Sequence, residues 1–484
     1  MLFNSYLFIF IFLPISLLVW FFLNKVGKDK AAQVFLVAMS LWFYAYFNYS
    51  YIWIILGSCI FNFGCSWLIE KFPIYRKWIG ISGIIGNLGI LFYYKYFDFF
   101  IENINFLFQK DIPLFHILLP LGISFFTFQQ LSYVVDRMRA DAVHYGLVDY
   151  LSFVTFFPQL IAGPIVLHTE LIPQFQDKEK RRFNADNFTD GCVQAILGLG
   201  KKVLIADTLG LVVNSTYDYR YYLTTWSTII FILAYAFELY FDFSGYCDIA
   251  MGVGKMFNFD IPANFNSPYR SRTIKEFWNR WHMTLSRFFI TYLYIPLGGS
   301  RKGKRRQMIN IMLVFLLSGL WHGASWNYVI WGLLNGIGVM LSNLRKNPPR
   351  YKFLSWLGTF SYFLFTLIFF RSETMEDVAI ILRGLINPVG VKFIYDMAGS
   401  MDIPELYLFK QAFQLFLPQY EGWIYLIAFT LLLIICILLL RGKNPEQIVK
   451  EGNYTTKTAI ILAVIFIWSV ISLSGVSTFL YFNF

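Results

Sequence analysis

His322 is the residue whose surroundings in this sequence best suit catalysis. It lies within residues 318–325 (SGLWHGAS), between two apolar segments, 308–321 and 326–343, which we expect to form a hairpin. Glycines on both sides of this histidine permit a tight turn and the close approach of a ligand. An imidazole can take a proton from a hydroxyl near neutral pH, which is the task of a general base in acyl transfer. The structural alternative is a buried histidine that only hydrogen-bonds a backbone carbonyl.

The length of the first arm of the hairpin predicts where His322 lies. Residues 308–321 provide about 14 residues, and at roughly 1.5 Å of rise per residue such a helix does not reach the far headgroups of a bilayer. We therefore expect His322 at membrane depth. Ionisable side chains in apolar surroundings are costly, and this cost makes them functional suspects.

His282 is the second candidate. It lies in residues 277–286 (FWNRWHMTLS), with Arg280 and Arg287 nearby. The side chain could contact an acyl donor or the reacting centre. The same composition is also common in aromatic and basic anchors at a membrane interface, and the residues alone favour that anchor. The other histidines have no comparable setting, and we expect them to be structural or exposed: His116, His144 and His168.

Three carboxylates lie toward the end of one long apolar segment. Residues 235–248 (YAFELYFDFSGYCD) contain Glu238, Asp242 and Asp248. Such carboxylates are either compensated by groups on neighbouring helices or line a polar passage. Their spacing alone does not separate these alternatives.

Several kinds of site have no signature in the chain. There is no GxxxxGK[ST] loop, no HExxH motif and no paired-cysteine pattern, and the five cysteines are scattered. We expect no metal site, and these absences argue against an ATP-driven pump and a metalloprotease. The net charge of +11 does not indicate nucleic acid as a partner, because the basic residues fall in short runs between apolar segments.

Composition predicts an all-α, polytopic membrane protein. Of the 484 residues, 57% are hydrophobic and only 14% are charged, too few to cover a soluble domain of this size. Apolar stretches of roughly 18 or more residues recur along the chain, each long enough to cross the lipid as a helix. We count roughly 11 passes plus re-entrant and interfacial pieces. No repeat or linker divides the chain, so we expect one domain over residues 1–484.

Basic runs predict the orientation of the passes. Residues 148–168 are an exception, because basic residues flank both ends and prolines interrupt the segment, so we expect a re-entrant loop. We place Lys201 and Lys202 on the cytoplasmic side, followed by an outward pass at 203–213 and an inward pass at 223–241. The basic region 254–307 we expect inside as well, partly on amphipathic helices under the headgroups.

A set of motifs in a fixed order makes the chain resemble a known family. It is similar to the membrane-bound O-acyltransferases, most closely the bacterial branch typified by the alginate O-acetyltransferase membrane subunit. The similarity covers nearly the whole chain and is densest from about 150 to 340. The matching segments are 156–164 (FFPQLIAGP), 240–246 (YFDFSGY), 264–269 (NFNSPY), 276–282 (EFWNRWH), 292–299 (YLYIPLGG), 319–323 (GLWHG) and 479–484 (FLYFNF).

The resemblance implies a fold, a reaction and a place in the cell. The family's catalytic histidine falls on His322, and its second motif residue, a histidine in this branch, falls on His282. By similarity, helices surround a central tunnel in a bacterial cytoplasmic membrane. The resemblance implies that a cytoplasmic thioester such as acetyl-CoA donates an acyl group, which in this branch is acetyl, to a hydroxyl of an extracytoplasmic polysaccharide or to a partner acetyltransferase. The remaining residues that we assign to the tunnel or the donor are Trp281, Trp321, Asn279, Arg280, Asp242 and Ser244.

Two other functions stay open. Residues 277–286 also resemble the D-alanyl transferase of teichoic acid, which takes its donor from a small acidic carrier protein. The basic segment 270–306 suits either coenzyme A or such a carrier. One departure from the branch is Ile290-Thr291, where Arg-Asp is frequent. A polysaccharide transporter is a weaker alternative, because it would need more charged residues within the apolar helices.

Overall fold

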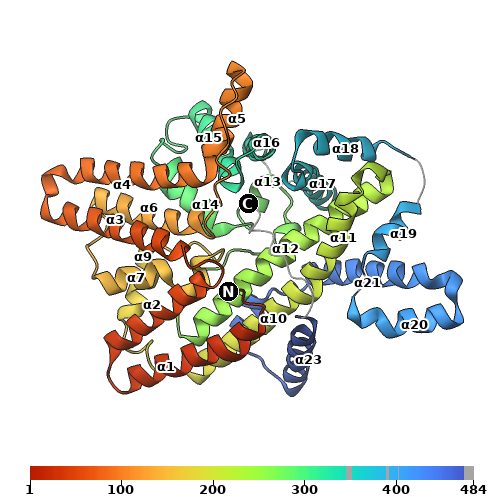
Figure 1. The fold of residues 1–484 in the computed structure, drawn as a ribbon, viewed down its shortest axis with the longest axis horizontal. Coiled ribbons are helices and arrows are strands. Elements are labelled where there is room, and N and C mark those ends of the chain that lie inside the picture. The colour runs from red at the N-terminus through yellow and green to blue at the C-terminus, as the bar shows by residue number, and fades with distance from the viewer. Residues whose placement is uncertain (345–350, 389–391, 402, 474–484) are drawn as a thin grey trace.

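The protein is built from helices joined by short connections (Figure 1). The computed structural model describes residues 1–344, 351–388, 392–401 and 403–473, and no strand occurs among them. The α-helices are α1 (Leu13–Lys25), α2 (Asp29–Ala45), α3 (Tyr51–Lys71), α4 (Arg76–Leu91), α5 (Phe97–Phe108), α6 (Ile123–Arg139), α7 (Leu147–Thr155), α8 (Phe157–Leu160), α9 (His168–Gln176), α10 (Ala185–Gly200), α11 (Asp207–Asp218), α12 (Thr225–Met256), α13 (Ile274–Trp278), α14 (Met283–Phe289), α15 (Lys304–His322), α16 (Trp326–Leu344), α17 (Lys352–Arg371), α18 (Met375–Leu385), α19 (Lys392–Gly399), α20 (Tyr407–Phe416), α21 (Glu421–Arg441), α22 (Pro445–Glu451) and α23 (Thr456–Ser472). Turns of π-helix precede or interrupt them at η1 (Phe8–Phe12), η3 (Phe92–Tyr96), η4 (Lys201–Ala206) and η7 (Ile290–Tyr294).

Five helices among the described residues are long and apolar enough to cross a membrane: Phe8–Lys25, Tyr51–Lys71, Thr225–Met256, Lys352–Arg371 and Gly422–Arg441. The all-helical prediction is therefore confirmed, while the number of passes stays a prediction. The basic residues at 345–350 and the motif at 479–484 lie outside the described residues.

Helix α12 forms the axis of the molecule. It has 32 residues, and 83% of its apolar window is buried inside the protein. The chain from α10 through η4 to α11 runs beside it as one continuous helix, because the residues at both junctions keep right-handed helical dihedrals (Figure 1). Glycines allow the two backbones to approach closely: a Cβ on Gly198 would lie 2.7 Å from the carbonyl oxygen of Gly245.

The cytoplasmic side expected for Lys201 and Lys202 stays a prediction, but the two lysines do not lie in a loop. Both lie within the continuous helix, and Lys202 is only 2% exposed. Lys202 pairs with Asp207 and Asp242 at 2.6 Å each, and Lys201 pairs with Asp248 at 2.7 Å. A buried cation is tolerated where carboxylates compensate its charge, and orientation rules that count loop charges do not apply to it.

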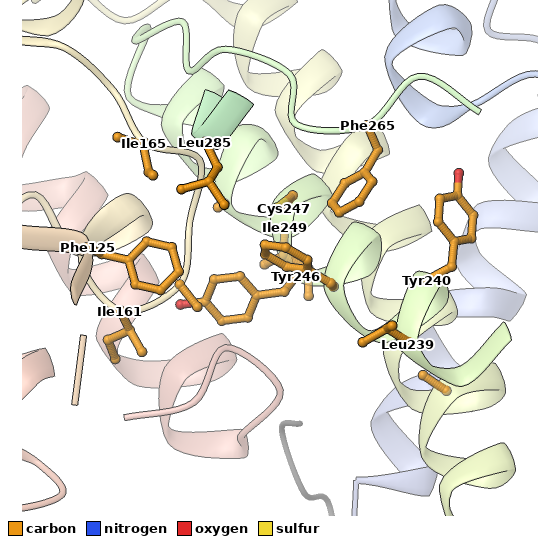
Figure 2. Packing of buried hydrophobic residues seen from close by; sticks show 14 of the residues in the cluster. Phe125, Ile161, Ile165, Leu239, Tyr240, Tyr246, Cys247, Ile249, Phe265 and Leu285 are labelled. Carbon is orange, nitrogen blue, oxygen red and sulfur yellow. The ribbon is translucent and has the colours of Figure 1, made fainter. Parts of the chain in front are cut away.

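The segment predicted to be re-entrant is a broken helix enclosed by other elements. Helices α7 and α8 are followed by an irregular stretch before α9 begins. Figure 2 shows Ile161 and Ile165 of this stretch beside Phe125 and Leu285. The backbone N–H of Ile165 donates to Thr284 Oγ1 at 2.9 Å. This enclosure supplies the partners that lipid cannot provide to an irregular backbone.

The hairpin expected around His322 is present, but its first arm, α15, has 19 residues rather than the expected 14 or so, because it begins within the basic run before residue 308. Helices α15 and α16 pack against each other, and their glycines approach the opposite backbone: a Cβ on Gly332 would lie 2.4 Å from the carbonyl oxygen of Phe315. The preceding region departs from the expected surface helices, because α13 and α14 are short and bury much of their length. The aromatic side chains of Phe277 and Trp278 drive this burial.

Candidate active site

His322 is the last residue of α15 and is 3% exposed. Three aromatic rings from three helices surround its imidazole edge-on. The ring centroids lie 4.9 Å from Trp321, 5.0 Å from Trp331 of α16 and 5.2 Å from Phe370 of α17. Tight packing of this kind holds the imidazole in one orientation, which a catalytic side chain requires.

His282 lies between α13 and α14, where the backbone turns through a left-handed conformation (φ 46°). The side chain is 1% exposed, and its Nδ1 lies 3.1 Å from Asn264 Oδ1. The burial excludes an anchor at the membrane interface, because such an anchor would be exposed to lipid headgroups.

The Asn264 amide determines which nitrogen of His282 carries the proton. Asn264 Oδ1 also accepts a hydrogen bond from the backbone N–H of Thr284 at 3.2 Å. Since that N–H can only donate, the oxygen of the amide faces both groups, and His282 Nδ1 must donate to it. His282 Nε2 is then the nitrogen with the lone pair, and it has no hydrogen-bond partner in the described part of the chain.

We expect Asn264→Ala to lower the free energy of unfolding by about 1–3 kcal/mol, because it leaves buried donors on Thr284 and His282 without an acceptor. Thermal unfolding in detergent measures the effect. Asn266→Ala, two residues further on and with an exposed side chain, is the matched control and should leave the melting temperature unchanged. Equal melting temperatures for the two variants would show that the Asn264 network is not needed.

Trp321 joins the two histidines. Its ring centroid lies 5.9 Å from that of His282 and 4.9 Å from that of His322. The indole N–H groups of Trp278, Trp321 and Trp331 are buried and have no partner among the described residues. A cluster of buried donors without acceptors suits a place where water or a polar ligand binds.

A small cavity of about 210 Å³ opens on the side of His282. Its wall includes Lys275, Trp278, Asn279, His282 and Ser318. The positive region of the sequence, 270–306, adjoins this side. Because basic runs predict the cytoplasmic side, we call it the donor-side cavity.

A larger cavity of about 760 Å³ lies at the carboxyl end of α15. Tyrosines and charged groups line it together with the turn that follows His322. The lining residues are Tyr94, Lys95, Ile117, Leu119, Asn214, Tyr217, Asp218, Tyr235, Gly323, Ala324, Ser325, Tyr328, Arg371, Ser372 and Glu373. We call it the acceptor-side cavity.

Along the chain, His322 lies between residues that line the two cavities. Ser318, one helical turn before it, lines the donor-side cavity, and Gly323, directly after it, lines the acceptor-side cavity. The imidazole itself lines neither cavity and is enclosed by Trp321, Trp331 and Phe370.

The structure brings together half of the residues assigned from sequence. His322, His282 and Trp321 are in contact, and Asn279 lines the donor-side cavity next to them. These four come from the end of α15 and from the segment between α13 and α14.

The other four residues lie elsewhere. Trp281 packs into the core, with its ring 5.1 Å from Phe265, because the left-handed turn at the next residue sends neighbouring side chains to opposite sides. Arg280 pairs with Glu276 at 3.0 Å. Asp242 is held by Lys202, and Ser244 lines a narrow pocket beside Lys201.

Residues far from these motifs complete the site. Trp331 and Phe370 enclose the imidazole of His322, and Lys95 and Arg371 line the acceptor-side cavity. Lys95 is a cation next to an apolar stretch, so the cost of burying charge could have identified it from sequence. The two aromatic residues carry no such signal in a chain with 20% aromatic residues.

Comparisons with known proteins show the family to which the chain belongs. A family model described as MBOAT, membrane-bound O-acyltransferase family, matches residues 118–371, which include both histidines. The chain is 36% identical to a peptidoglycan O-acetyltransferase of Helicobacter pylori, over 100% of this chain and 98% of the relative. It is 36% identical to a probable alginate O-acetylase AlgI of Pseudomonas putida, over 78% of this chain and 79% of the relative. A teichoic acid D-alanyltransferase of Bacillus subtilis is 28% identical, over 62% of this chain and 78% of the relative.

Proposed function

Since this chain belongs to the membrane-bound O-acyltransferase family, we propose that it moves acetyl groups from a cytoplasmic thioester to a hydroxyl on an extracytoplasmic polysaccharide. The observation that carries the proposal is the position of His322 on the chain between Ser318, which lines one cavity, and Gly323, which lines the other. A donor and an acceptor held in different compartments can react only where both reach one catalytic group.

His322 acts as the general base in this reaction. It takes the proton of the acceptor hydroxyl while the oxygen attacks the thioester carbonyl. The tetrahedral intermediate collapses, the C–S bond breaks, and the leaving thiolate takes up the proton. The unpartnered indole N–H groups of Trp321 and Trp331 are buried donors beside the imidazole, and they suit the negative charge that develops on the carbonyl oxygen.

His282 orients the donor. Because Asn264 fixes its Nδ1 proton, its Nε2 accepts a hydrogen bond, which an amide N–H of a pantetheine arm can supply. The donor-side cavity, of about 210 Å³, has room for the acetyl thioester end of the donor. The nucleotide of acetyl-CoA would stay outside, against the basic segment that contains residues 301–306.

The acceptor-side cavity suits a carbohydrate. Tyr94, Tyr217, Tyr235 and Tyr328 offer apolar ring faces for sugars, and the adjacent charged and amide groups offer hydrogen bonds to their hydroxyls. The relatives named for peptidoglycan and alginate act on polysaccharides. A partner acetyltransferase that receives the acetyl group first would use the same opening.

The proposal is tested by chemical analysis of surface polysaccharide from a bacterial strain that lacks this protein. We expect O-acetyl esters to disappear on deletion, to return with the wild-type chain, and to stay absent with His322→Ala. Polymer export should continue in all strains, whereas a transporter would fail to export. Loss of D-alanyl esters with acetyl esters retained would instead assign the chain to teichoic acid D-alanylation.

A direct assay separates acetyl-CoA from other thioesters. Purified full-length protein in lipid nanodiscs is given acetyl-CoA labelled in the acetyl group, and the released coenzyme A thiol is measured with and without a polysaccharide acceptor. Acceptor-dependent release supports acetyl-CoA as the donor. If the acyl group is transferred only when an acyl carrier protein supplies it, acetyl-CoA is not the donor.

A further inference from the structure

The carboxyl end of α15, which holds His322, is bound by a segment from the N-terminal part of the chain. The last carbonyl groups of a helix have no partners within that helix. Here the hydroxyl of Tyr96 donates to the carbonyl oxygen of Leu320 at 3.0 Å. The ammonium of Lys95 donates to the carbonyl oxygen of Trp321 and lies 3.3 Å from that of His322. Two adjacent residues therefore satisfy three successive carbonyl groups.

The local backbone explains how adjacent side chains reach one helix end. Lys95 and Tyr96 belong to η3, a π-helical turn between α4 and α5. Neighbouring residues on a regular α-helix do not face the same partner. A π-helical turn alters this spacing, and such turns are frequent at functional sites.

The charge of Lys95 has no other compensation. Its ammonium lies 5.8 Å from the centroid of the Trp321 ring, and within the described part of the chain no carboxylate pairs with it. Burying a cation in apolar surroundings costs free energy, but the negative end of a helix dipole stabilises such a cation. A residue needed only for packing would not require the charge.

We propose that Lys95 is a positioning residue for the acyl transfer, holding the end of α15 so that the imidazole of His322 keeps its place between the two cavities. Lys95 also lines the acceptor-side cavity, next to the glycine that follows His322. A lysine has three N–H donors, and the two carbonyl groups occupy two of them. Displacing this clamp moves the imidazole relative to the acceptor, and a shift of about 1 Å in such a group can cost on the order of 100-fold in rate. The inference rests on the proposed role of His322.

The decisive experiment compares Lys95→Met and Lys95→Arg in full-length protein in nanodiscs. Steady-state acetyl transfer gives kcat and the KM for the thioester donor. We expect Lys95→Met to lower kcat on the order of 100-fold while the donor KM changes less than about twofold, because the donor-side cavity is lined by other residues. Lys95→Arg keeps a charged donor and should recover at least about a tenth of the wild-type kcat.

Two further variants separate positioning from general stability. Lys110→Met makes the same substitution at an exposed lysine after α5 and should match the wild type. Tyr96→Phe removes only the hydrogen bond to Leu320 and should cost less kcat than Lys95→Met. Melting temperatures are measured for every variant, so that a poorly folded protein is recognised. If Lys95→Met is poorly folded, the kcat of Lys95→Arg is compared with that of the wild type instead.

The outcomes distinguish this inference from the function on which it rests. A folded Lys95→Met protein with wild-type kcat overturns the positioning role, and so does a loss of kcat that no arginine restores. If His322→Ala also retains activity, the proposed function itself fails. If only His322→Ala is inactive, the function stands and the role of Lys95 falls.

Discussion

His322→Ala is expected to lower kcat/KM for acetyl transfer by a factor on the order of 10³, because a general base in a preorganised site contributes about 10²–10⁴. The imidazole lies between the two cavities and in contact with Trp321, Trp331 and Phe370. No neighbouring ring can act as the base in place of His322, because indole and phenyl groups accept no proton. The measurement is acceptor-dependent release of coenzyme A thiol in nanodiscs.

Two controls keep this result interpretable. His322→Gln preserves most of the side-chain volume and a hydrogen-bonding end but is not a base, so it should be as inactive as the alanine variant while melting closer to the wild type. His116→Asn changes an exposed histidine whose left-handed backbone an asparagine tolerates, and it should keep full activity. Activity of His322→Gln above about a tenth of the wild type would exclude the base mechanism.

Lys202→Met is expected to be the most damaging change to stability. Lys202 is buried and lies 2.6 Å from both Asp207 and Asp242. Removing the cation leaves the buried carboxylate of Asp242 and the half-buried one of Asp207 without it, and breaking a buried ion pair by deleting one partner costs about 3–5 kcal/mol. We expect little folded protein after detergent extraction, which fluorescence-detected size-exclusion chromatography and thermal melting measure.

The charge argument predicts a partial rescue. The double variant Lys202→Met with Asp242→Asn carries one carboxylate fewer and should recover part of the lost melting temperature. Lys450→Met breaks an exposed pair with Glu446 and should cost no more than about 1 kcal/mol. If the double variant melts below the single variant, hydrogen bonding rather than charge compensation holds the helices together at this point.

These two predictions concern different parts of the molecule. The ion pairs lie between α12 and the continuous helix of α10, η4 and α11, whereas the histidines lie between α13, α14 and α15. Changes more than about 7–10 Å apart with no shared partner add independently. A Lys202 variant that folds under stabilising conditions should therefore retain the donor KM of the wild type.

Several features follow from the sequence alone. Low charge and repeated apolar stretches predict helices in a membrane, because lipid leaves backbone groups no partner except within a helix. Glycines next to His322 and the short arm before it predict a buried hairpin tip, and the structure has that tip at the end of α15. Prolines and flanking charges predict a re-entrant segment over residues 148–168, and the structure has a broken helix there. Each of these inferences depends only on residues near one another in the chain.

The tertiary structure decided the features that depend on distant residues. Lys202 is buried because carboxylates on α11 and α12 meet it, and no local pattern reports such partners. Asp242 and Ser244 share a motif with the family yet face Lys202 and a separate pocket. Lys95 reaches His322 across 227 residues. The physical reason is that hydrophobic periodicity tells which face of a helix is buried, whereas the packing of whole helices determines which side chains on those faces touch.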